Sequence, residues 1–342
     1  MFEQLKKQWF LILLFGVVAA GLCFPAPGLW IGANVSNKVF LFTLLFLSSL
    51  PLEAKDLLAG LRAFRPIMLA LLGTYAILPL LFCASAKVLE YFHVETALGM
   101  GLIVMGAAPT SQASAAIWTR FGGGNTALAV ALTLINSAAN VVLGPLVLRM
   151  ALGAGDVEWP IEKLIGDLAL VVLLPIIVGQ FAGRLLREGV ARNATLISVI
   201  SRFVLLTIIL TAASKAAERA GNVSALSVAL LVALCVFSHM WVLMALDFLG
   251  RLIRIPREDR IATLMVGGQK TLPVGVQLLT YFPGMELGVL SMMCYHASQL
   301  LFDSVLVEVF RRRSAKKTQS AASDAPAPAD KPAETQTANA AQ

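Results

Sequence analysis

The fold is decided by two stretches, Gly106-Ala107-Ala108-Pro109-Thr110-Ser111-Gln112-Ala113-Ser114 and Gly267-Gly268-Gln269-Lys270-Thr271-Leu272-Pro273-Val274-Gly275. Each lies within an apolar run and places Gly, Pro and polar side chains where a simple membrane helix would carry Leu or Val. Because a freed N–H or C=O group cannot face lipid, each break must line a cavity or bond to neighbouring helices. The two stretches therefore predict two broken membrane helices that meet inside a helical bundle.

The composition of the whole chain supports a membrane protein. Of 342 residues, 58% are hydrophobic and only 14% are charged, against about 25% charged in an ordinary soluble chain. So few charges could not cover the surface of a soluble fold of this size. The net charge of +7 is then better explained by cations on cytoplasmic loops than by binding to nucleic acid. The four cysteines have no disulfide-framework, metal or redox spacing.

The apolar runs predict ten membrane-spanning helices, since one span needs roughly 20 apolar residues. Their centres lie near residues 16, 45, 77, 107, 137, 172, 206, 236, 270 and 298. Short polar or Gly- and Pro-rich connections separate them and leave no room for an aqueous domain. Pro79 and Pro175 predict kinks inside their helices.

The distribution of Lys and Arg predicts that both termini are cytoplasmic. One set of alternate connections, beginning with the N-terminus, holds 19 cations: Lys6, Lys7, Lys55, Arg62, Arg65, Arg120, Arg184, Arg187, Arg192, Arg251, Arg254, Arg257, Arg260, Arg311, Arg312, Arg313, Lys316, Lys317 and Lys331. The other set holds 6: Lys38, Lys87, Arg149, Lys163, Lys215 and Arg219. Cytoplasmic loops carry the excess of Lys and Arg, which places the chain in a bacterial-type inner membrane with both ends inside.

Ten helices divide into two five-helix repeats, residues 1–150 and 151–313. The odd number inverts the second repeat relative to the first, which is a transporter architecture. The first apolar run is interpreted as a helix; a cleaved signal is the alternative, but Leu22 stands where cleavage before Cys23 would need a small residue. Residues 314–342 lack Leu, Ile, Val and aromatic residues and are predicted to be a disordered cytoplasmic tail.

The two breaks occupy equivalent places, in helices 4 and 9 of the ten, so the binding site is predicted where these helices cross. After each break a half-helix starts, with Thr110 or Ser111 and Thr271 as candidate N-caps. Its N-terminal N–H groups would attract an anion. The predicted substrate- or ion-binding residues are Thr110, Ser111, Gln112, Ser114, Thr133, Asn136, Gln269, Lys270, Thr271 and His296. Six of them, Gln112, Ser114, Thr133, Gln269, Lys270 and Thr271, are expected to line one water-accessible cavity near mid-membrane.

Lys270 is the most informative of these residues, because a Lys at the centre of a membrane helix costs about 2.5–3.5 kcal/mol. One interpretation is that it binds the anionic substrate. The alternative is a structural ion pair with a buried carboxylate such as Asp303. Thr133, Asn136 and Asn140 share one face of their helix and predict a polar seam that faces the bundle interior. His239 is interpreted as an interhelical hydrogen-bonding residue, with a proton carrier as the alternative.

These residues resemble those of the bile acid:sodium symporter family. Pro109 to Ser114, with Gly123-Gly124-Asn125, is similar to the family's fourth helix and its sequel, and Gly267 to Gly275 to the second crossing helix. The string Gly-Gly-Gln-Lys-Thr-Leu, with Tyr295-His296 and Gln299, is most similar to the SBF-like branch that includes solute carrier family 10 member 7. The resemblance covers about residues 5–313. It implies ten helices in a panel and core arrangement, crossing of helices 4 and 9, and secondary transport of an organic anion.

The resemblance also implies where sodium would bind in coupled members, and this chain departs from that pattern. The positions that match the first sodium site are Ser114, Ala115, Ala129, Thr133 and Met265, where the family has Ser, Asn, Ser, Thr and Glu. The second site uses the same Glu and two Gln positions, here Thr74 and Gln269, with the carbonyls of Val266 and Gly268. The carboxylate is missing, and an ammonium on Lys270 would repel Na⁺ by several kcal/mol at an effective dielectric near 20. Residual sodium ligands would be Ser114, Thr133 and Gln269.

The sequence therefore predicts a secondary transporter of an organic anion, bile-acid-like or carboxylate-bearing, that is coupled to protons or to no ion. A sodium-coupled symporter is the alternative, and a membrane sensor that binds a ligand without transporting it is an alternative of another class. No Walker-type loop, His and Cys metal spacing or Gly-x-Ser-x-Gly elbow is found, so neither an ATP-driven pump nor an enzyme is expected and no cofactor is implied. The expected partners are the lipid bilayer and a small organic anion; the oligomeric state is left open.

Overall fold

A computed structural model describes residues 2–51, 62–153, 161–220 and 223–323, and its regular elements in these ranges are all helical. The predicted all-α class is confirmed for this part of the chain. Five stretches are long and apolar enough to cross a membrane. They are Phe64–Tyr91, comprising α5 (Phe64–Leu72), the π-helical η1 (Gly73–Ile77) and α6 (Leu78–Tyr91); α9 (Thr126–Leu152); Glu162–Leu185, within α10 (Ile161–Leu168), η2 (Ala169–Leu173) and α11 (Leu174–Leu185); Ala194–Ala217 of α13 (Ala194–Ala220); and α14 (Ala225–Leu252).

A bent pair of helices gives a sixth candidate span. Leu13–Cys23 of α1 (Phe2–Cys23) meets α2 (Pro25–Asn34) at an angle of 91°. The remaining helices are shorter or more polar: α3 (Asn37–Ser49), α7 (Thr96–Ala107), α8 (Gln112–Phe121), α12 (Arg187–Arg192), α15 (Arg257–Gly268), α16 (Leu272–Leu279) and α17 (Gly288–Ser323). Each of the ten predicted span centres falls within one of these elements or at a break between two of them.

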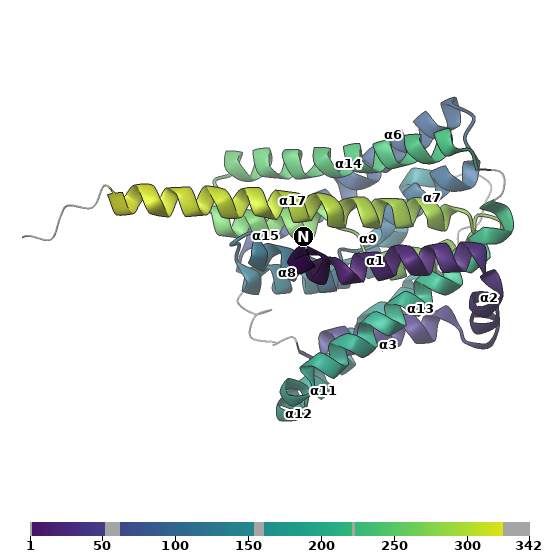
Figure 1. Ribbon diagram of the computed structural model, residues 1–342, viewed down its shortest axis with the longest axis horizontal. Coiled ribbons are helices and arrows are strands. Elements are labelled where there is room, and N and C mark those ends of the chain that lie inside the picture. The colour runs from purple at the N-terminus through teal and green to yellow at the C-terminus, as the bar shows by residue number, and fades with distance from the viewer. Residues whose placement is uncertain (1, 52–61, 154–160, 221–222, 324–342) are drawn as a thin grey trace, which may run out of the picture.

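The helices form two bundles; in Figure 1, α6, α14 and α17 run nearly parallel in the upper part, and α13 runs diagonally below them. The crossing bundle consists of α5 to α9 and α14 to α17 with η1, where α7 packs on α6 and α17, and α15 packs on α5, α8, α9 and α14. The panel bundle consists of α1 to α3 and α10 to α13 with η2, where α13 packs on α1, α2 and α3. The bundles meet where α9 contacts α10 and η2, and where α16 and α17 contact α13.

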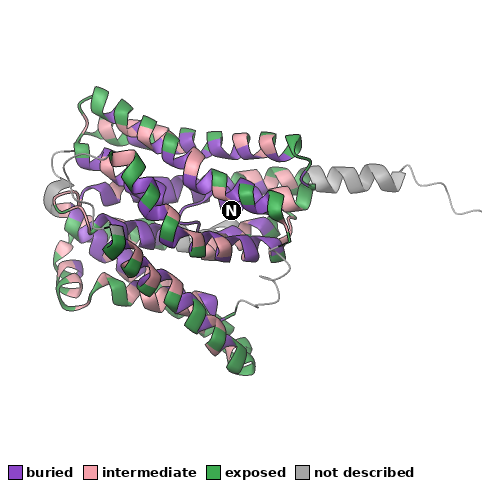
Figure 2. Ribbon diagram, turned by 180° about the vertical axis from the view of Figure 1, so that it is seen from behind, coloured by how far each residue is buried: buried purple, intermediate pink, exposed green. Residues whose placement is uncertain are grey.

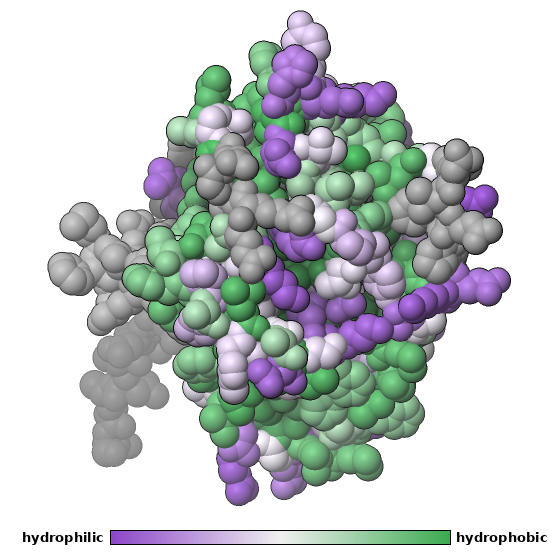
Figure 3. Space-filling model, turned by 90° about the vertical axis from the view of Figure 1, so that its right-hand side faces the viewer, coloured by the Kyte–Doolittle hydropathy of each residue, from purple (hydrophilic) through white to green (hydrophobic). Residues whose placement is uncertain are grey.

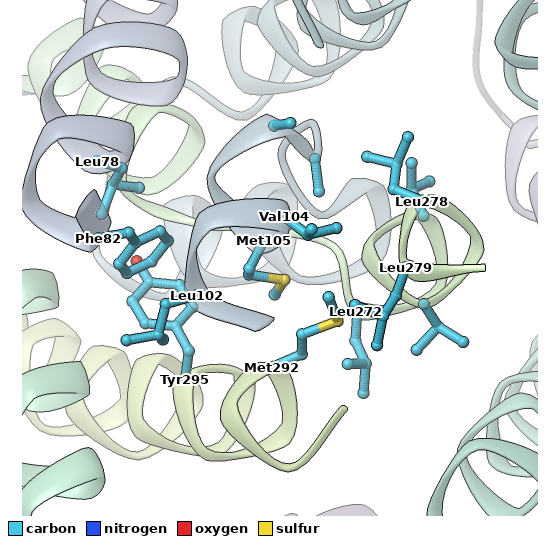
Figure 4. Close-up of a cluster of buried hydrophobic side chains, with 14 of the residues drawn as sticks. Leu78, Phe82, Leu102, Val104, Met105, Leu272, Leu278, Leu279, Met292 and Tyr295 are labelled. Atoms are coloured by element: carbon cyan, nitrogen blue, oxygen red, sulfur yellow. The ribbon is translucent and has the colours of Figure 1, made fainter. Parts of the chain in front are cut away.

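Buried side chains concentrate in the crossing bundle, while the free end of the panel bundle is mostly exposed (Figure 2). One buried cluster joins α6, α7, α16 and α17 (Figure 4). In it the rings of Phe82 and Tyr295 meet edge to face with centroids 4.7 Å apart, a favourable aromatic geometry. The many exposed apolar side chains on the outside of both bundles, among them Leu80, Phe181 and Phe203, are expected of a surface solvated by lipid.

Helix α7 approaches α17 at the level of the backbone, because two glycines face each other. A Cβ atom added to Gly101 would lie 2.1 Å from the carbonyl oxygen of Gly288. Small residues allow such close approach between membrane helices, where packing rather than the hydrophobic effect drives association. This contact fixes α7, and with it the first break, against α17.

Pro79 and Pro175 each follow a π-helical turn, η1 and η2, instead of producing the simple kinks that the sequence predicts. A proline has no N–H and its ring crowds the preceding turn. A wider π turn accommodates both problems. The consequence for η1 is a free carbonyl group, which the site uses.

Polar contacts join connections at both ends of the molecule. At one end Asn125 Nδ2 donates to Asp259 at 2.8 Å, and an Arg257 nitrogen donates to the carbonyl of Phe310 at 3.1 Å. At the other end Lys38 pairs with Asp167 at 2.9 Å, and the Tyr281 hydroxyl donates to the same carboxylate. Figure 3, which views the right-hand end of Figure 1, shows hydrophilic side chains gathered around its centre.

Helix α17 continues to Ser323, past residue 314, where the sequence analysis places the start of a disordered tail. Residues 314–323 contain Ala, Lys and Gln, which have favourable helix propensities, so the last membrane helix is extended. The rest of the predicted tail, 324–342, lies outside the described residues, as do Lys55 and Lys331.

Candidate functional site

The two breaks touch each other. The first is the extended segment between α7 and α8, and the second is the segment between α15 and α16. The N–H of Thr271 donates to the carbonyl of Pro109 at 2.9 Å. This backbone hydrogen bond joins the two stretches on which the sequence prediction of a crossing was based.

Four successive carbonyl groups at the end of α7, those of residues 106 to 109, have donors although the helix stops there. Helix ends leave carbonyl groups without partners, and Pro109 removes one further N–H. The Ala107 carbonyl accepts from Asn140 Nδ2 at 2.7 Å, and the Pro109 carbonyl accepts from Thr271. The carbonyls of Gly106 and Ala108 both accept from the side chain of Lys270.

Lys270 is fully buried and uses its ammonium group as a ligand for three carbonyl oxygens. Its Nζ lies 2.6 Å from the oxygen of Thr74, 2.6 Å from that of Gly106 and 2.7 Å from that of Ala108. An ammonium group has three N–H donors and no acceptor. All three donors are therefore used, and a positive charge sits at the C-terminal end of α7, where the helix dipole favours it.

The carbonyl of Thr74 is available to Lys270 because of the π turn. In η1 the N–H of Leu78 donates to Gly73, five residues earlier. The next residue in this register is Pro79, which would face Thr74 but has no N–H. The sequence predicts only a kink at Pro79 and does not identify the Thr74 carbonyl as the third acceptor. The signal was present as a proline five residues after Thr74.

Asp303, the carboxylate considered as a partner for Lys270, has different partners. Its Oδ1 lies 2.9 Å from His239 Nε2 and its Oδ2 accepts from Gln269 Nε2 at 2.6 Å. Among the described residues, no ion pair joins Lys270 to an acidic side chain. The predicted ion pair between Lys270 and a carboxylate is therefore wrong. The ammonium group donates to backbone carbonyls instead.

Gln299 of α17 fixes the backbone of Lys270. Its Oε1 accepts from the Lys270 N–H and its Nε2 donates to the Lys270 carbonyl, both at 2.9 Å. The second proton of Nε2 is directed at His296 Nδ1, 3.0 Å away. This places His296 beside the second break, as predicted, but behind Gln299 rather than in contact with the first break.

Gln269 and Ser114 connect the second break to the start of α8. The Ser114 hydroxyl lies 2.6 Å from Gln269 Oε1 and 2.7 Å from the Ser111 hydroxyl. Thr133, the third residual sodium ligand, does not join them, because its hydroxyl donates to the carbonyl of Ala129 in its own helix at 2.7 Å. The structure thus brings together two of the three residual ligand side chains.

Asn136 of α9 holds the first break from the other side. Its Oδ1 accepts from the N–H of Thr110 at 2.9 Å, and its Nδ2 donates to the Thr74 hydroxyl at 2.9 Å. The hydroxyl of Tyr75, which sequence reasoning missed, donates to the Asn136 carbonyl at 2.7 Å. With Asn140 on Ala107, Asn136 confirms that the polar seam of this helix faces the bundle interior.

At the starts of the half-helices α8 and α16, some polar side chains are partly exposed and some buried polar atoms have no hydrogen-bond partner. Ser111 and Thr271 occupy the N-cap positions of α8 and α16 as predicted, but neither side chain caps its helix. Gln112, Ser114 and Thr271 are partly exposed, whereas Gln269 and Lys270 are not. In this conformation the first three residues therefore reach the protein surface, and the last two are enclosed. Thr110 Oγ1 and Gln112 Oε1 are buried atoms without a hydrogen-bond partner in the described chain.

The sequence of this chain is similar to those of known membrane transporters. The family model of the SBF-like CPA transporter family matches residues 8–312. The chain is 29% identical to the probable sodium/metabolite cotransporter BASS4, chloroplastic, of Oryza sativa subsp. indica, over 90% of this chain and 76% of that protein. It is 26% identical to sodium/bile acid cotransporter 7-A of Xenopus laevis, over 90% and 93%. It is 25% identical to sodium/bile acid cotransporter 7 of Mus musculus, over 90% and 94%.

Proposed function

The chain belongs to the SBF-like CPA transporter family, a family of transporters and not of enzymes, and on this premise we propose that it is a secondary transporter of an organic anion. It has ten membrane helices arranged as two inverted five-helix repeats, residues 1–150 and 151–313. The substrate binds where the broken helices α7–α8 and α15–α16 cross. Both termini lie on the cytoplasmic side of a bacterial-type inner membrane.

The observation that carries the proposal is the position of the Lys270 ammonium. It donates hydrogen bonds to three carbonyl oxygens at the crossing. A coupling cation would need hard oxygen ligands of the same kind. A fixed positive charge there does the work of a bound cation. Together with Met265 in place of the family's Glu, this supports transport without Na⁺.

The anion site is assigned to the starts of the half-helices α8 and α16. Helix N-termini bind anions through N–H groups and through the helix dipole, and neither of these two is capped by its own side chain. The hydroxyl oxygen Oγ1 of Thr110 is buried without a partner close to this point. A hydroxyl group that lacks a partner can donate to a carboxylate or sulfonate oxygen. The site also includes Ser111, Ser114, Asn136, Gln269, Thr271 and His296. Thr133 stabilises α9 beside the site, because its hydroxyl donates to the Ala129 carbonyl.

Two other functions remain as alternatives that the experiment separates. The names of the relatives favour a sodium-coupled symporter, because each of them is called a sodium cotransporter. A sensor that uses the same crossing to bind a ligand would have the same residues but would not move the ligand across the membrane.

The proposal predicts counterflow of an organic anion in proteoliposomes. Purified protein, reconstituted with unlabelled taurocholate inside, should take up radiolabelled taurocholate from outside in choline buffer at a rate equal to that in Na⁺ buffer. Counterflow needs alternating access but no ion gradient. Protein-free vesicles set the background. Binding of taurocholate without counterflow would favour a sensor, and counterflow that requires Na⁺ would favour the symporter.

The proposed orientation predicts the location of two connections. Reporter domains fused after Arg187, in α12, and after Arg257, at the start of α15, should both read cytoplasmic, because Lys and Arg concentrate in these connections. Fusion after Lys163, in the opposite set of connections, is the matched control and should read external. An external signal from either of the first two fusions would break the inverted repeat.

A further inference from the structure

A second buried polar cluster lies next to the crossing and is not used by the proposed site chemistry. It consists of His239 on α14 with Tyr295 and Asp303 on α17, all without exposed surface. His239 Nε2 lies 2.9 Å from Asp303 Oδ1, and His239 Nδ1 lies 3.2 Å from the Tyr295 hydroxyl oxygen. The Tyr295 hydroxyl is also 2.8 Å from the carbonyl of Gly268, the last residue of α15.

Counting protons in this chain of hydrogen bonds fixes the charge of the pair. A tyrosine hydroxyl has one proton to donate, and the carbonyl of Gly268 has no proton at all. Tyr295 therefore donates to Gly268 and accepts from His239, so Nδ1 of the imidazole carries a proton. The contact between Nε2 and Asp303 Oδ1 then needs one more proton between them, whichever atom holds it.

The histidine–aspartate pair is accordingly neutral as a unit and holds one proton more than a neutral imidazole beside a carboxylate. His296 gives the opposite result by the same count. Its Nδ1 accepts from Gln299 Nε2, so this ring is neutral with a proton on Nε2 only. The two buried histidines thus differ in protonation because of their partners.

We propose that the His239–Asp303 pair binds and releases the coupling proton of the transport cycle. The proposal rests on the proposed function and names its coupling ion. Loss of the shared proton to water leaves a single negative charge on the pair, with the remaining imidazole proton on Nε2 facing Asp303. Nδ1 then has a lone pair, and the Tyr295 hydroxyl rotates to donate to it instead of to Gly268.

This rotation links the proton to the crossing. When Tyr295 leaves Gly268, the terminal carbonyl of α15 loses its donor immediately before Gln269 and Lys270. A buried carbonyl without a partner destabilises the arrangement that buries it, so the deprotonated pair favours a different arrangement of the break. Asp303 acts on the same segment directly, through its hydrogen bond to Gln269.

On the helices around the pair, the described chain has one other buried histidine, His296 of α17, which is neutral by the count above. The helices packed against α14 are α5, α6, α15 and α17, with η1. Their other titratable groups near the pair are uncharged or committed: Cys235, Cys294, Tyr75, and Lys270, whose three N–H groups are directed at carbonyls. Lys87 and Glu90 of α6 are exposed, and Asp247 of α14 pairs with Arg251 and Arg260 at the end of the helix.

A proton fits this site better than Na⁺ does. Both oxygens of Asp303 already face nitrogen atoms, those of His239 and of Gln269. Na⁺ prefers several hard oxygen ligands and would be repelled by N–H groups directed at it. A proton needs a single acceptor, and by the count above the hydrogen bond between His239 and Asp303 already contains this proton.

The variant Asp303→Asn tests the proposal, because it keeps every hydrogen bond and removes the exchangeable proton. The amide oxygen can accept from Gln269, the amide nitrogen can donate to His239 Nε2, and Nδ1–H still reaches Tyr295. We expect taurocholate counterflow within about twofold of wild type, but loss of the accumulation that an imposed pH gradient, acid outside, drives in wild type. Asp247→Asn, on the same bundle, should retain both activities.

The outcomes separate this proposal from the proposed function. Wild-type counterflow without any pH-driven accumulation, or undiminished accumulation by Asp303→Asn, would overturn the proton site and leave the transporter intact. Absence of wild-type counterflow would count against the proposed function itself.

A measurement without substrate decides the proton count. The chain has 3 histidines, so ¹⁵N-histidine labelling gives three resolvable rings, assigned with His93→Gln and His296→Gln. We expect Nδ1 of His239 to carry a proton in wild type and in Asp303→Asn, with His296 protonated on Nε2 alone in both. A wild-type His239 whose Nδ1 carries no proton would refute the proposal.

Discussion

Replacing Lys270 with methionine is expected to destabilise the protein by about 3 kcal/mol or more, the largest loss predicted for any single substitution considered. Methionine fills a similar volume but leaves the carbonyls of Thr74, Gly106 and Ala108 without a donor. Each buried, unsatisfied group costs about 1–3 kcal/mol. The measurement is the thermal unfolding midpoint of the purified protein in detergent, followed by loss of the monodisperse peak.

Two further variants show whether the effect belongs to this ammonium. Lys163→Met, on an exposed face of α10, should change stability by less than about 0.5 kcal/mol. Lys270→Arg should not rescue, because a planar guanidinium cannot direct three N–H groups at the three oxygens that surround one Nζ. If Lys270→Met unfolds at the wild-type temperature, the ammonium does not hold the crossing.

The second large effect is expected from a double variant that creates a sodium-binding site at the crossing. The double variant Met265→Glu, Lys270→Ala introduces the carboxylate that the family resemblance implies at this position, removes the ammonium and frees three carbonyl oxygens. Without Na⁺ the buried carboxylate and the free carbonyls should destabilise the protein strongly. Na⁺ should then raise the unfolding midpoint of this variant. The expected stabilisation is about 1.4 kcal/mol when Na⁺ is at ten times its dissociation constant.

Matched controls for this experiment are Lys270→Ala alone, which lacks the carboxylate, and Met265→Glu alone, in which the new carboxylate can pair with Lys270. Neither should gain a comparable response to Na⁺ over choline. A double variant that is equally stable in both salts would show that Lys270 does not occupy a cation position.

The sequence predicted the crossing because its signal is local. Gly, Pro and polar residues at two matched places require broken helices, and the need to satisfy the freed backbone groups brings the breaks together. The contact between Ser114 and Gln269 and the bond from Thr271 to Pro109 follow from that requirement. The direction of the Asn136 seam follows from helical periodicity.

The partners of the buried charges could not be predicted in the same way. Lys270 binds carbonyl oxygens, which every residue possesses, and the choice of Thr74 depends on a π turn that periodicity does not reveal. Asp303 and His239 lie on different helices, and only the packing of α14 on α17 makes them neighbours. Local rules specify which groups need partners, while the tertiary structure decides which partners they find.

We propose that the ammonium of Lys270 takes the place of a bound coupling cation. The deciding measurement is the unfolding midpoint of the wild-type protein in NaCl and in choline chloride, at one pH and one ionic strength. We expect equal midpoints, since the three carbonyl oxygens already accept from Lys270. A saturable increase in the midpoint that is specific to Na⁺ would contradict it and would return the protein to sodium symport.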